Sequence, residues 1–195
     1  MSELFSIQLQ NRQQQGRDGV WLDLPTTTEQ VQAALRQIGI SSDNPQGLFI
    51  SGYFAEEEKR FAIPYNMVLA SNVDELNFLA SRLETLSTGE RAELNAALQA
   101  PQSELFSIGR ITDFPENVDY YVHLPDVHGP AQLGDYYLNR SGMVDMPEEW
   151  KGGIDTAQFG RYVAQQEQGV FTEYGYLVKS GDAWQKVHEG QPVPE

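Results

Sequence analysis

Between Arg110 and Arg140 the chain contains no basic residue, yet acidic residues recur there every few positions. The acids stand among aromatic and aliphatic residues such as Phe114, Tyr120 and Leu133. Blocks of consecutive like charges usually form disordered tails, whereas spaced acids among apolar residues are typical of a folded surface. This pattern predicts a folded segment with carboxylates standing on it. The acids concerned are Asp113, Glu116, Asp119, Asp126 and Asp135.

The acidic surplus extends over the whole chain and peaks in its middle. The 195 residues include 28 acidic and 13 basic residues, a formal net charge of −15. Residues 61–160 carry 15 acids and 5 bases, so they hold two-thirds of the surplus. Such an excess repels nucleic acids and anionic membranes and attracts cationic surfaces. Two interpretations follow: acidity that only keeps the protein soluble, and acidity displayed to a basic partner.

Several classes of protein are excluded by composition. The chain has no cysteine, which removes disulfide frameworks, thiolate nucleophiles and cysteine metal sites. Its first residues have no basic region followed by an apolar run, and no stretch approaches the roughly 20 apolar residues of a bilayer span. Apolar residues make up 40% of the chain, enough to bury a core. We therefore expect a soluble cytoplasmic protein that does not associate with membranes.

A mixed sheet with one helix is expected in residues 1–66. A capping box, formed by Thr26 with Glu29 or by Thr27 with Gln30, predicts the start of the helix. A glycine after its last apolar residue predicts where it ends. Short runs of alternating apolar residues predict strands at residues 5–9, 20–24 and 47–54, with a further short strand at 61–63.

A small helical bundle is expected in residues 67–112. Leucines at helical spacing predict a helix over residues 74–86. Ser87 and Glu90 form another capping box, and Pro101 ends the helix that follows. The central part of the chain is therefore predicted to be helical, in contrast to the segment before it.

The last segment, residues 113–195, returns to mixed structure. The pattern predicts a strand over 119–124, a helix over 133–140, a helix that begins at Asp155, and a hairpin turning at 179–182. The hairpin strands are expected at residues 169–178 and 183–187. The predicted fold class is α+β, as three small domains: a mixed sheet plus helix, a short helical bundle, and a sheet plus helices.

One hexapeptide occurs twice. Ser-Glu-Leu-Phe-Ser-Ile stands at residues 2–7 and again at 103–108. The residues that follow the two copies differ, so we interpret the match as coincidence rather than as a structural repeat.

No catalytic, cofactor-binding or metal-binding residues are predicted. The phosphate-binding loop, the dinucleotide fingerprint and the nucleophile elbow are all missing from the sequence. His123 and His128 flank a turn with Asp126, which is the one arrangement that suggests a metal site. A pair of loop histidines without a third firm ligand is more often plain surface. We expect a protein without enzymatic activity and without a cofactor, and keep a site at these three residues as a rival hypothesis.

Three parts of the chain, in order, resemble the ArdA family of antirestriction proteins. The first is the strand, proline and helix from Val20 to Ile40, and the second is the Asp-Glu-Leu-Asn start of the helix at Asp74. The third is a C-terminal motif in which Thr156 replaces the aromatic residue common in the family. The motif residues are Asp155, Phe159, Gly160, Arg161, Gly169 and Phe171.

The resemblance implies a function and an assembly. Proteins of this family are elongated homodimers of three small domains per chain, are carried by mobile genetic elements, and mimic duplex DNA. They occupy the DNA-binding groove of the methyltransferase core of type I restriction-modification enzymes and inhibit them by competition. The resemblance therefore implies such an enzyme as partner, with no direct binding of nucleic acid.

The acids that would imitate phosphates are inferred from the charge distribution. The alternative function is an acidic binding module for another basic DNA-binding protein, without specificity for restriction enzymes. The candidate acids are Asp74, Glu75, Glu84, Glu90, Glu93, Asp113, Glu116, Asp119, Asp126, Asp135, Asp145, Glu148 and Glu149.

Overall fold

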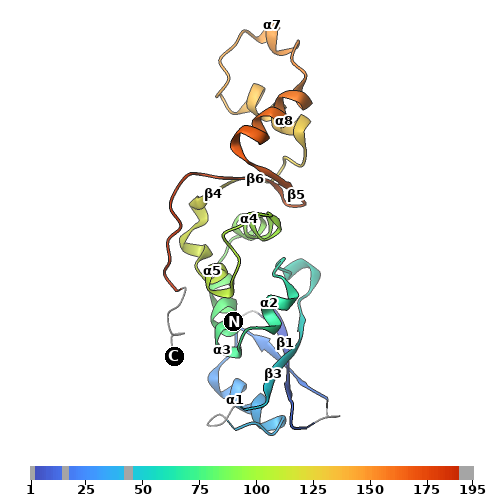
Figure 1. The fold of residues 1–195 in the computed structure, drawn as a ribbon, viewed down its shortest axis with the longest axis vertical. Helices are drawn as coiled ribbons and strands as arrows, with labels where there is room; N and C mark the ends of the chain where they lie inside the picture. Colours follow the sequence, from blue (N-terminus) through green and yellow to red (C-terminus); the bar gives the residue numbers. More distant parts are fainter. Residues whose placement is uncertain (1–2, 15–17, 42–45, 189–195) are drawn as a thin grey trace. The chain divides into compact units, whose positions relative to one another are not determined.

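Helices and two three-stranded sheets alternate along the chain in the computed structural model, which describes residues 3–14, 18–41 and 46–188 (Figure 1). Contacts within the chain gather these elements into two units. Unit 1 comprises residues 1–87, 105–116 and 186–195, and unit 2 comprises residues 88–104 and 117–185. The α+β fold class is confirmed, whereas the division into three small domains, 1–66, 67–112 and 113–195, stays a prediction.

The sheet of unit 1 consists of β1 (Phe5–Asn11), β2 (Val20–Leu24) and β3 (Leu48–Phe54). Its order is β2-β1-β3, and β1 is antiparallel to both neighbours. Because side chains alternate across a strand, Phe5, Ile7 and Leu9 of β1 point to one face, where they are fully buried. Three of the four strands predicted for residues 1–66 are therefore confirmed.

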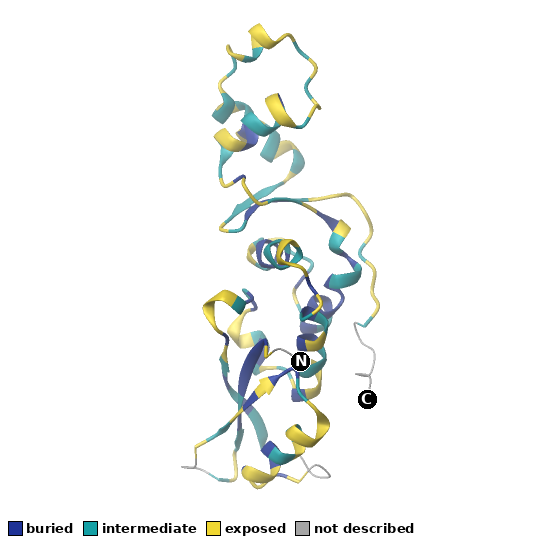
Figure 2. Cartoon of the chain, turned by 180° about the vertical axis from the view of Figure 1, so that it is seen from behind, coloured by how far each residue is buried: buried dark blue, intermediate teal, exposed yellow. Residues whose placement is uncertain are grey.

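Helices cover the buried face of this sheet. Of the two capping boxes that the sequence offered, the one between Thr27 and Gln30 forms, and the helix ends before Gly39, whose φ is +70°. The central leucine stripe is buried as predicted, and its helix packs on β2. Figure 2 shows the buried residues of the chain in dark blue. The helical elements of unit 1 are α1 (Thr28–Gln37), η1 (Glu57–Lys59), α2 (Tyr65–Leu69), α3 (Val73–Leu83), α5 (Ile108–Thr112) and η2 (Phe114–Glu116).

Unit 2 combines a second sheet with helices. The sheet has the order β4-β6-β5, and both pairings are antiparallel. Helix α4 packs on the sheet, while α6 and α8 pack on each other. The elements are α4 (Thr88–Gln99), η3 (Val118–Tyr120), β4 (Tyr121–Leu124), α6 (Pro130–Asp135), the π-helical turn η4 (Tyr136–Arg140), α7 (Glu148–Lys151), α8 (Thr156–Glu167), β5 (Val170–Thr172) and β6 (Gly175–Lys179).

Two predicted strands are wrong. The C-terminal hairpin turns between Thr172 and Gly175, not at residues 179–182, and residues 183–187 form no strand. Gly175 has a φ of +118°, which glycine adopts without strain, so the turn is fixed there. Residues 61–63 also form no strand, although Phe61 and Ile63 are buried. Their apolar pattern reflects burial of a loop rather than strand pairing.

Helices α2, α5 and α7 are not indicated by any sequence pattern. Each has five residues or fewer, which is too short for a 3.6-residue period to show. Ser107 caps α5 by accepting the N–H of Arg110 at 3.2 Å. Within the described ranges, the helices lack the length and apolar content that a membrane span requires.

Candidate functional site

The thirteen candidate carboxylates differ in their exposure to solvent. Asp113 is fully buried, and its Oδ1 accepts the backbone N–H of His188 at 2.6 Å. A buried carboxylate bonded to the backbone in this way stabilises the fold and is not accessible to a partner. Five others are half-buried: Glu84, Glu90, Glu93, Glu116 and Asp135. Seven are exposed: Asp74, Glu75, Asp119, Asp126, Asp145, Glu148 and Glu149.

The two exposed candidate acids of unit 1 stand at the start of α3. Asp74 and Glu75 occupy its first turn, where the helix dipole favours negative charge. Asn72 caps the helix by accepting the N–H of Glu75 at 2.9 Å, and Ser71 donates to the Glu75 carboxylate at 2.7 Å. These acids therefore stabilise the helix end while their charge stays on the surface. Glu116 instead pairs with Arg82 inside the unit.

Unit 2 carries the greater charge density. Its 86 residues include thirteen acids and five bases, a net of −8. Asp135 pairs with Arg140 at 3.3 Å and Glu148 with Lys151 at 3.0 Å. Among the described residues, four of the exposed candidate acids of this unit have no cation within salt-bridge distance. These are Asp119 in η3, Asp126 after β4, Asp145 before α7, and Glu149 in α7.

Glu93 differs from the other candidates because its environment disfavours ionisation. Burial, followed by the nearby carboxylates Glu90 and Asp119, raises the pKa of Glu93 to about 8. Its Oε1 is buried without a hydrogen bond from any described residue. At neutral pH this carboxyl is therefore mostly protonated, and it adds little negative charge to the surface.

Replacing Glu93 with glutamine is expected to stabilise the protein in mildly alkaline solution. Because the folded-state pKa is raised from 4.5 to about 8, the unfolded chain ionises first as the pH rises. The native state thus loses stability between these two pH values. Glu93→Gln should gain about 2 kcal/mol at pH 8, after allowance for partial exposure, and almost nothing at pH 4.

Urea unfolding at several pH values measures this effect. The control is Glu149→Gln, which removes an exposed carboxylate of the same type. Equal pH profiles for both variants would contradict the assignment of a raised pKa to Glu93.

The C-terminal motif residues build the packing of unit 2. Asp155 caps α8 by accepting the N–H of Gln158 at 2.9 Å. A Cβ at Gly160 would lie 1.8 Å from the Pro130 carbonyl oxygen, and one at Gly169 would lie 1.9 Å from the Tyr176 hydroxyl. Both glycines are therefore required for close approach.

The other motif residues lie at the surface or at its margin. Phe171 packs against Tyr176, with ring centroids 4.9 Å apart. Phe159 is half-buried, and Arg161 is exposed. Most of the motif thus supports the fold and does not itself form a binding surface.

Two features of this packing could not be found by spacing. Gly134 on α6 faces α8, and a Cβ there would lie 1.9 Å from the Thr156 carbonyl oxygen. Glu167 accepts hydrogen bonds from the hydroxyls of Tyr137 and Tyr176, the latter at 3.0 Å. Burial, together with the Glu167 charge, raises the pKa of both tyrosines. A composition rich in tyrosine was the only signal for this network.

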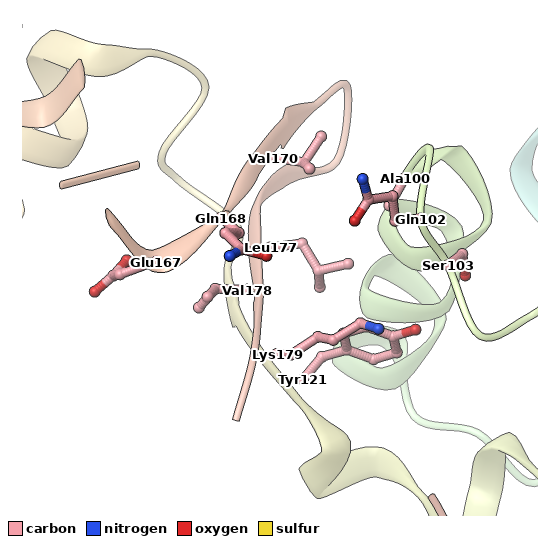
Figure 3. Close-up of a pocket in the computed structure, with 10 residues that line it drawn as sticks. All are labelled: Ala100, Gln102, Ser103, Tyr121, Glu167, Gln168, Val170, Leu177, Val178 and Lys179. Atoms are coloured by element: carbon pink, nitrogen blue, oxygen red, sulfur yellow. The ribbon is translucent and has the colours of Figure 1, made fainter. Parts of the chain in front are cut away.

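A pocket of about 120 Å³ lies between the sheet of unit 2 and the end of α4 (Figure 3). Three of its polar side chains, those of Lys179, Tyr121 and Glu167, are bonded within the chain. Lys179 pairs with Glu104 at 3.0 Å, and the Tyr121 hydroxyl accepts the Glu104 N–H at 3.2 Å. Glu167, which also lines the pocket, accepts the two tyrosine hydroxyls. The bonds fix these groups as part of the fold.

The three residues of the rival enzyme hypothesis are not brought together. Nε2 of His123 lies 2.7 Å from the Tyr174 carbonyl oxygen, across the β-sheet. His128 is exposed, and Asp126 points to solvent in the turn between them. Across the described parts of the chain, no cluster of three or more His, Cys, Asp or Glu side chains could hold a metal ion.

A family model described as antirestriction protein (ArdA) matches residues 15–178, which is most of the chain. No curated protein matches the sequence.

Proposed function

Because the chain belongs to the ArdA family of antirestriction proteins, we propose that it inhibits type I restriction-modification enzymes by occupying their DNA-binding groove. The inhibition is stoichiometric and competitive: the protein takes the place of duplex DNA on the methyltransferase core. No covalent step is required. The protein therefore acts without a catalytic residue or a cofactor.

The observation that supports this function is the set of unpaired, exposed carboxylates in unit 2. Asp119, Asp126, Asp145 and Glu149 stand on or beside regular elements, and no described cation neutralises them. Duplex DNA presents one charge per about 1.7 Å of axis, and basic grooves bind it largely through phosphate contacts. Carboxylates held on a folded surface present negative charge to the same lysines and arginines.

Each unit contributes its own part of the proposed surface, made up of the seven exposed candidates and the half-buried Glu84 and Glu90; the buried Asp113 is omitted. Glu93 contributes only above its raised pKa. Because the surface is held together by the fold, it avoids the ordering entropy that a disordered acidic tail loses on binding. The charge still lowers the stability of the free protein through self-repulsion.

The assembly and its setting are part of the proposal. The protein acts as a homodimer in the cytoplasm of a cell that a mobile element has entered, with three small domains in each chain. A two-fold axis suits a partner with paired recognition domains, and a second copy lengthens the display of charge. The protein itself does not bind nucleic acid, because the −15 charge repels phosphates.

A restriction assay in cells tests the function directly. Cells that carry a type I system and express the chain should be infected by unmodified phage at nearly the efficiency of cells without the system. Phage that carries the protective modification is the control, because its plating does not depend on inhibition. Unchanged restriction, with the protein present at normal level, would overturn the proposal.

A binding panel distinguishes the alternative function. The purified chain is titrated against a type I methyltransferase, a nucleoid protein and an unrelated nuclease, each in competition with labelled duplex DNA. We expect displacement of DNA from the methyltransferase at the lowest concentration. Equal displacement from all three would favour an unspecific acidic binding module.

A further inference from the structure

The outer face of the unit 1 sheet bears side chains that the acidic-surface function does not use. The strand register sets Trp21, Gln8 and Gly52 in one row across β2, β1 and β3. The next row on the same face contains Asp23, Ser6 and Phe54. These rows lie opposite the buried face formed by Ile7 and its neighbours.

Trp21 lies across this face rather than standing away from it. A Cβ at Gly52 would be 3.0 Å from Cη2 of the indole, although β1 separates the two strands. The ring therefore extends over Gln8 to the third strand, and glycine leaves room for its edge. Trp21 nevertheless keeps 49% of its surface exposed, and Phe54 keeps 59%. An open aromatic surface remains on the outer side.

A carboxylate stands beside the indole. Asp23 lies two residues along β2, so its side chain is on the same face at about 7 Å. Ser6 donates to Asp23 at 2.8 Å, which orients the Asp23 carboxylate on this face, and Glu3 lies 3.5 Å from the same hydroxyl. No described cation lies within salt-bridge distance of Asp23, which is exposed. The face therefore combines an aromatic ring with an unneutralised negative charge.

The same face already holds a guanidinium elsewhere. Arg12 places its guanidinium carbon 5.2 Å from the centre of the Phe49 ring, and Phe49 lies on the outward side of β3, paired with Gln10. A flat aromatic surface on this sheet thus accommodates an arginine head group. Trp21, a stronger cation–π partner than phenylalanine, has no such group over it among the cation–ring contacts of the described residues.

We propose that the outer face of this sheet binds an arginine side chain of a basic protein, with the guanidinium stacked on Trp21 and paired with Asp23. Charge complementarity selects this occupant: arginine is planar, stacks on aromatic rings and pairs with carboxylates. A nucleic acid strand would also stack on Trp21, but its phosphates would meet Asp23 and Glu3. The site does not depend on which basic protein the acidic surface binds.

Nuclear magnetic resonance of the full chain measures the site. The three tryptophans, Trp21, Trp150 and Trp184, each give an indole N–H signal. The probes are a blocked pentapeptide with a central arginine, its citrulline counterpart, which is neutral and nearly the same shape, and oligo-dT. The arginine peptide should shift the Trp21 signal to saturation, and citrulline should require a roughly two- to fivefold higher concentration.

Matched variants distinguish the site from diffuse charge. Asp23→Asn should weaken binding of the arginine peptide about two- to fivefold and reduce its preference over citrulline. Asp182→Asn removes the same charge from an exposed position in unit 2, outside the proposed acidic surface, and should leave binding unchanged. Trp150→Ala should leave the saturable shift of the Trp21 signal unchanged.

The inference would be overturned if the Trp21 signal showed no saturable shift, or if the citrulline peptide gave an equal response. A Trp150 signal that saturated at the same concentration would overturn it as well. Saturation by oligo-dT would also overturn it, because it would indicate a platform for nucleobases. Because no restriction enzyme is present, these results are independent of the phage assay. Failure of one proposal therefore leaves the other standing.

Discussion

Replacing Gly160 with alanine should prevent the native packing of unit 2. The added Cβ would lie 1.8 Å from the Pro130 carbonyl oxygen and 2.8 Å from the Gly134 backbone nitrogen. Both are backbone atoms, so no side chain can rotate away and α6 must separate from α8. Overpacking of this kind typically costs about 1–3 kcal/mol when side chains adjust. Against rigid backbone we expect a loss of about 3 kcal/mol or more.

Thermal unfolding followed by near-ultraviolet circular dichroism measures the loss, because the tyrosine network of Glu167 belongs to this part of the fold. Gly152→Ala is the matched control: Gly152 follows α7, has a φ of −62°, and would have no neighbouring atom within 4 Å of an added Cβ. It should unfold like the wild type. If Gly160→Ala unfolded at the same temperature as Gly152→Ala, α6 and α8 would not approach as closely as the structure indicates.

Neutralising three unpaired acids of unit 2 should weaken inhibition by about tenfold or more. The variant combines Asp126→Asn, Asp145→Asn and Glu149→Gln. Individual exposed charge pairs contribute about 0.2–1 kcal/mol, and three such losses approach or exceed the roughly 1.4 kcal/mol that corresponds to a factor of ten. Competition with labelled duplex DNA for a type I methyltransferase measures the change, and its dependence on salt should become shallower.

The control for this variant removes the same number of negative charges, but from other positions on the protein. Asp18→Asn, Glu57→Gln and Glu58→Gln remove three exposed acids from unit 1, outside the proposed surface. They should weaken inhibition much less. Equal losses in the two triple variants would mean that total acidity, rather than its placement, determines binding. Normal unfolding curves for both are required for the comparison.

The repeated hexapeptide shows how little a short sequence decides alone. Residues Phe5 and Ile7 of the first copy are buried and lie in β1, the central strand of its sheet. In the second copy Phe106 is 63% exposed, while Ser107 caps α5 and Ile108 begins it. The first copy has two neighbouring strands to satisfy its backbone, and the second has none. Interpreting the match as coincidence was correct.

Elements with strong local signals could be predicted from the sequence. The capped helices that begin after Thr27 and Asp155, and the leucine stripe of α3, form as expected because caps and periodicity act within a few residues. The C-terminal hairpin was misplaced, since the Lys179–Asp182 segment carries the usual turn residues while the turn forms at Gly175. The short helices α2, α5 and α7 could not be predicted, because they are too short to show a periodic pattern and their formation depends on contacts with distant segments.

The sequence by itself determined the charge, the α+β class and the family. These depend on composition, on local periodicity and on residues in a fixed order, all of which are present in the unfolded chain. Only the tertiary structure decided which carboxylates belong to the surface. Asp113 and Asp126 look alike in the sequence. Asp113, however, is buried and accepts a hydrogen bond from the backbone N–H of His188, whereas Asp126 is exposed to solvent. Burial, neighbouring charge and close backbone approach arise only when distant segments meet, and they separate a charge used by the fold from one available to a partner.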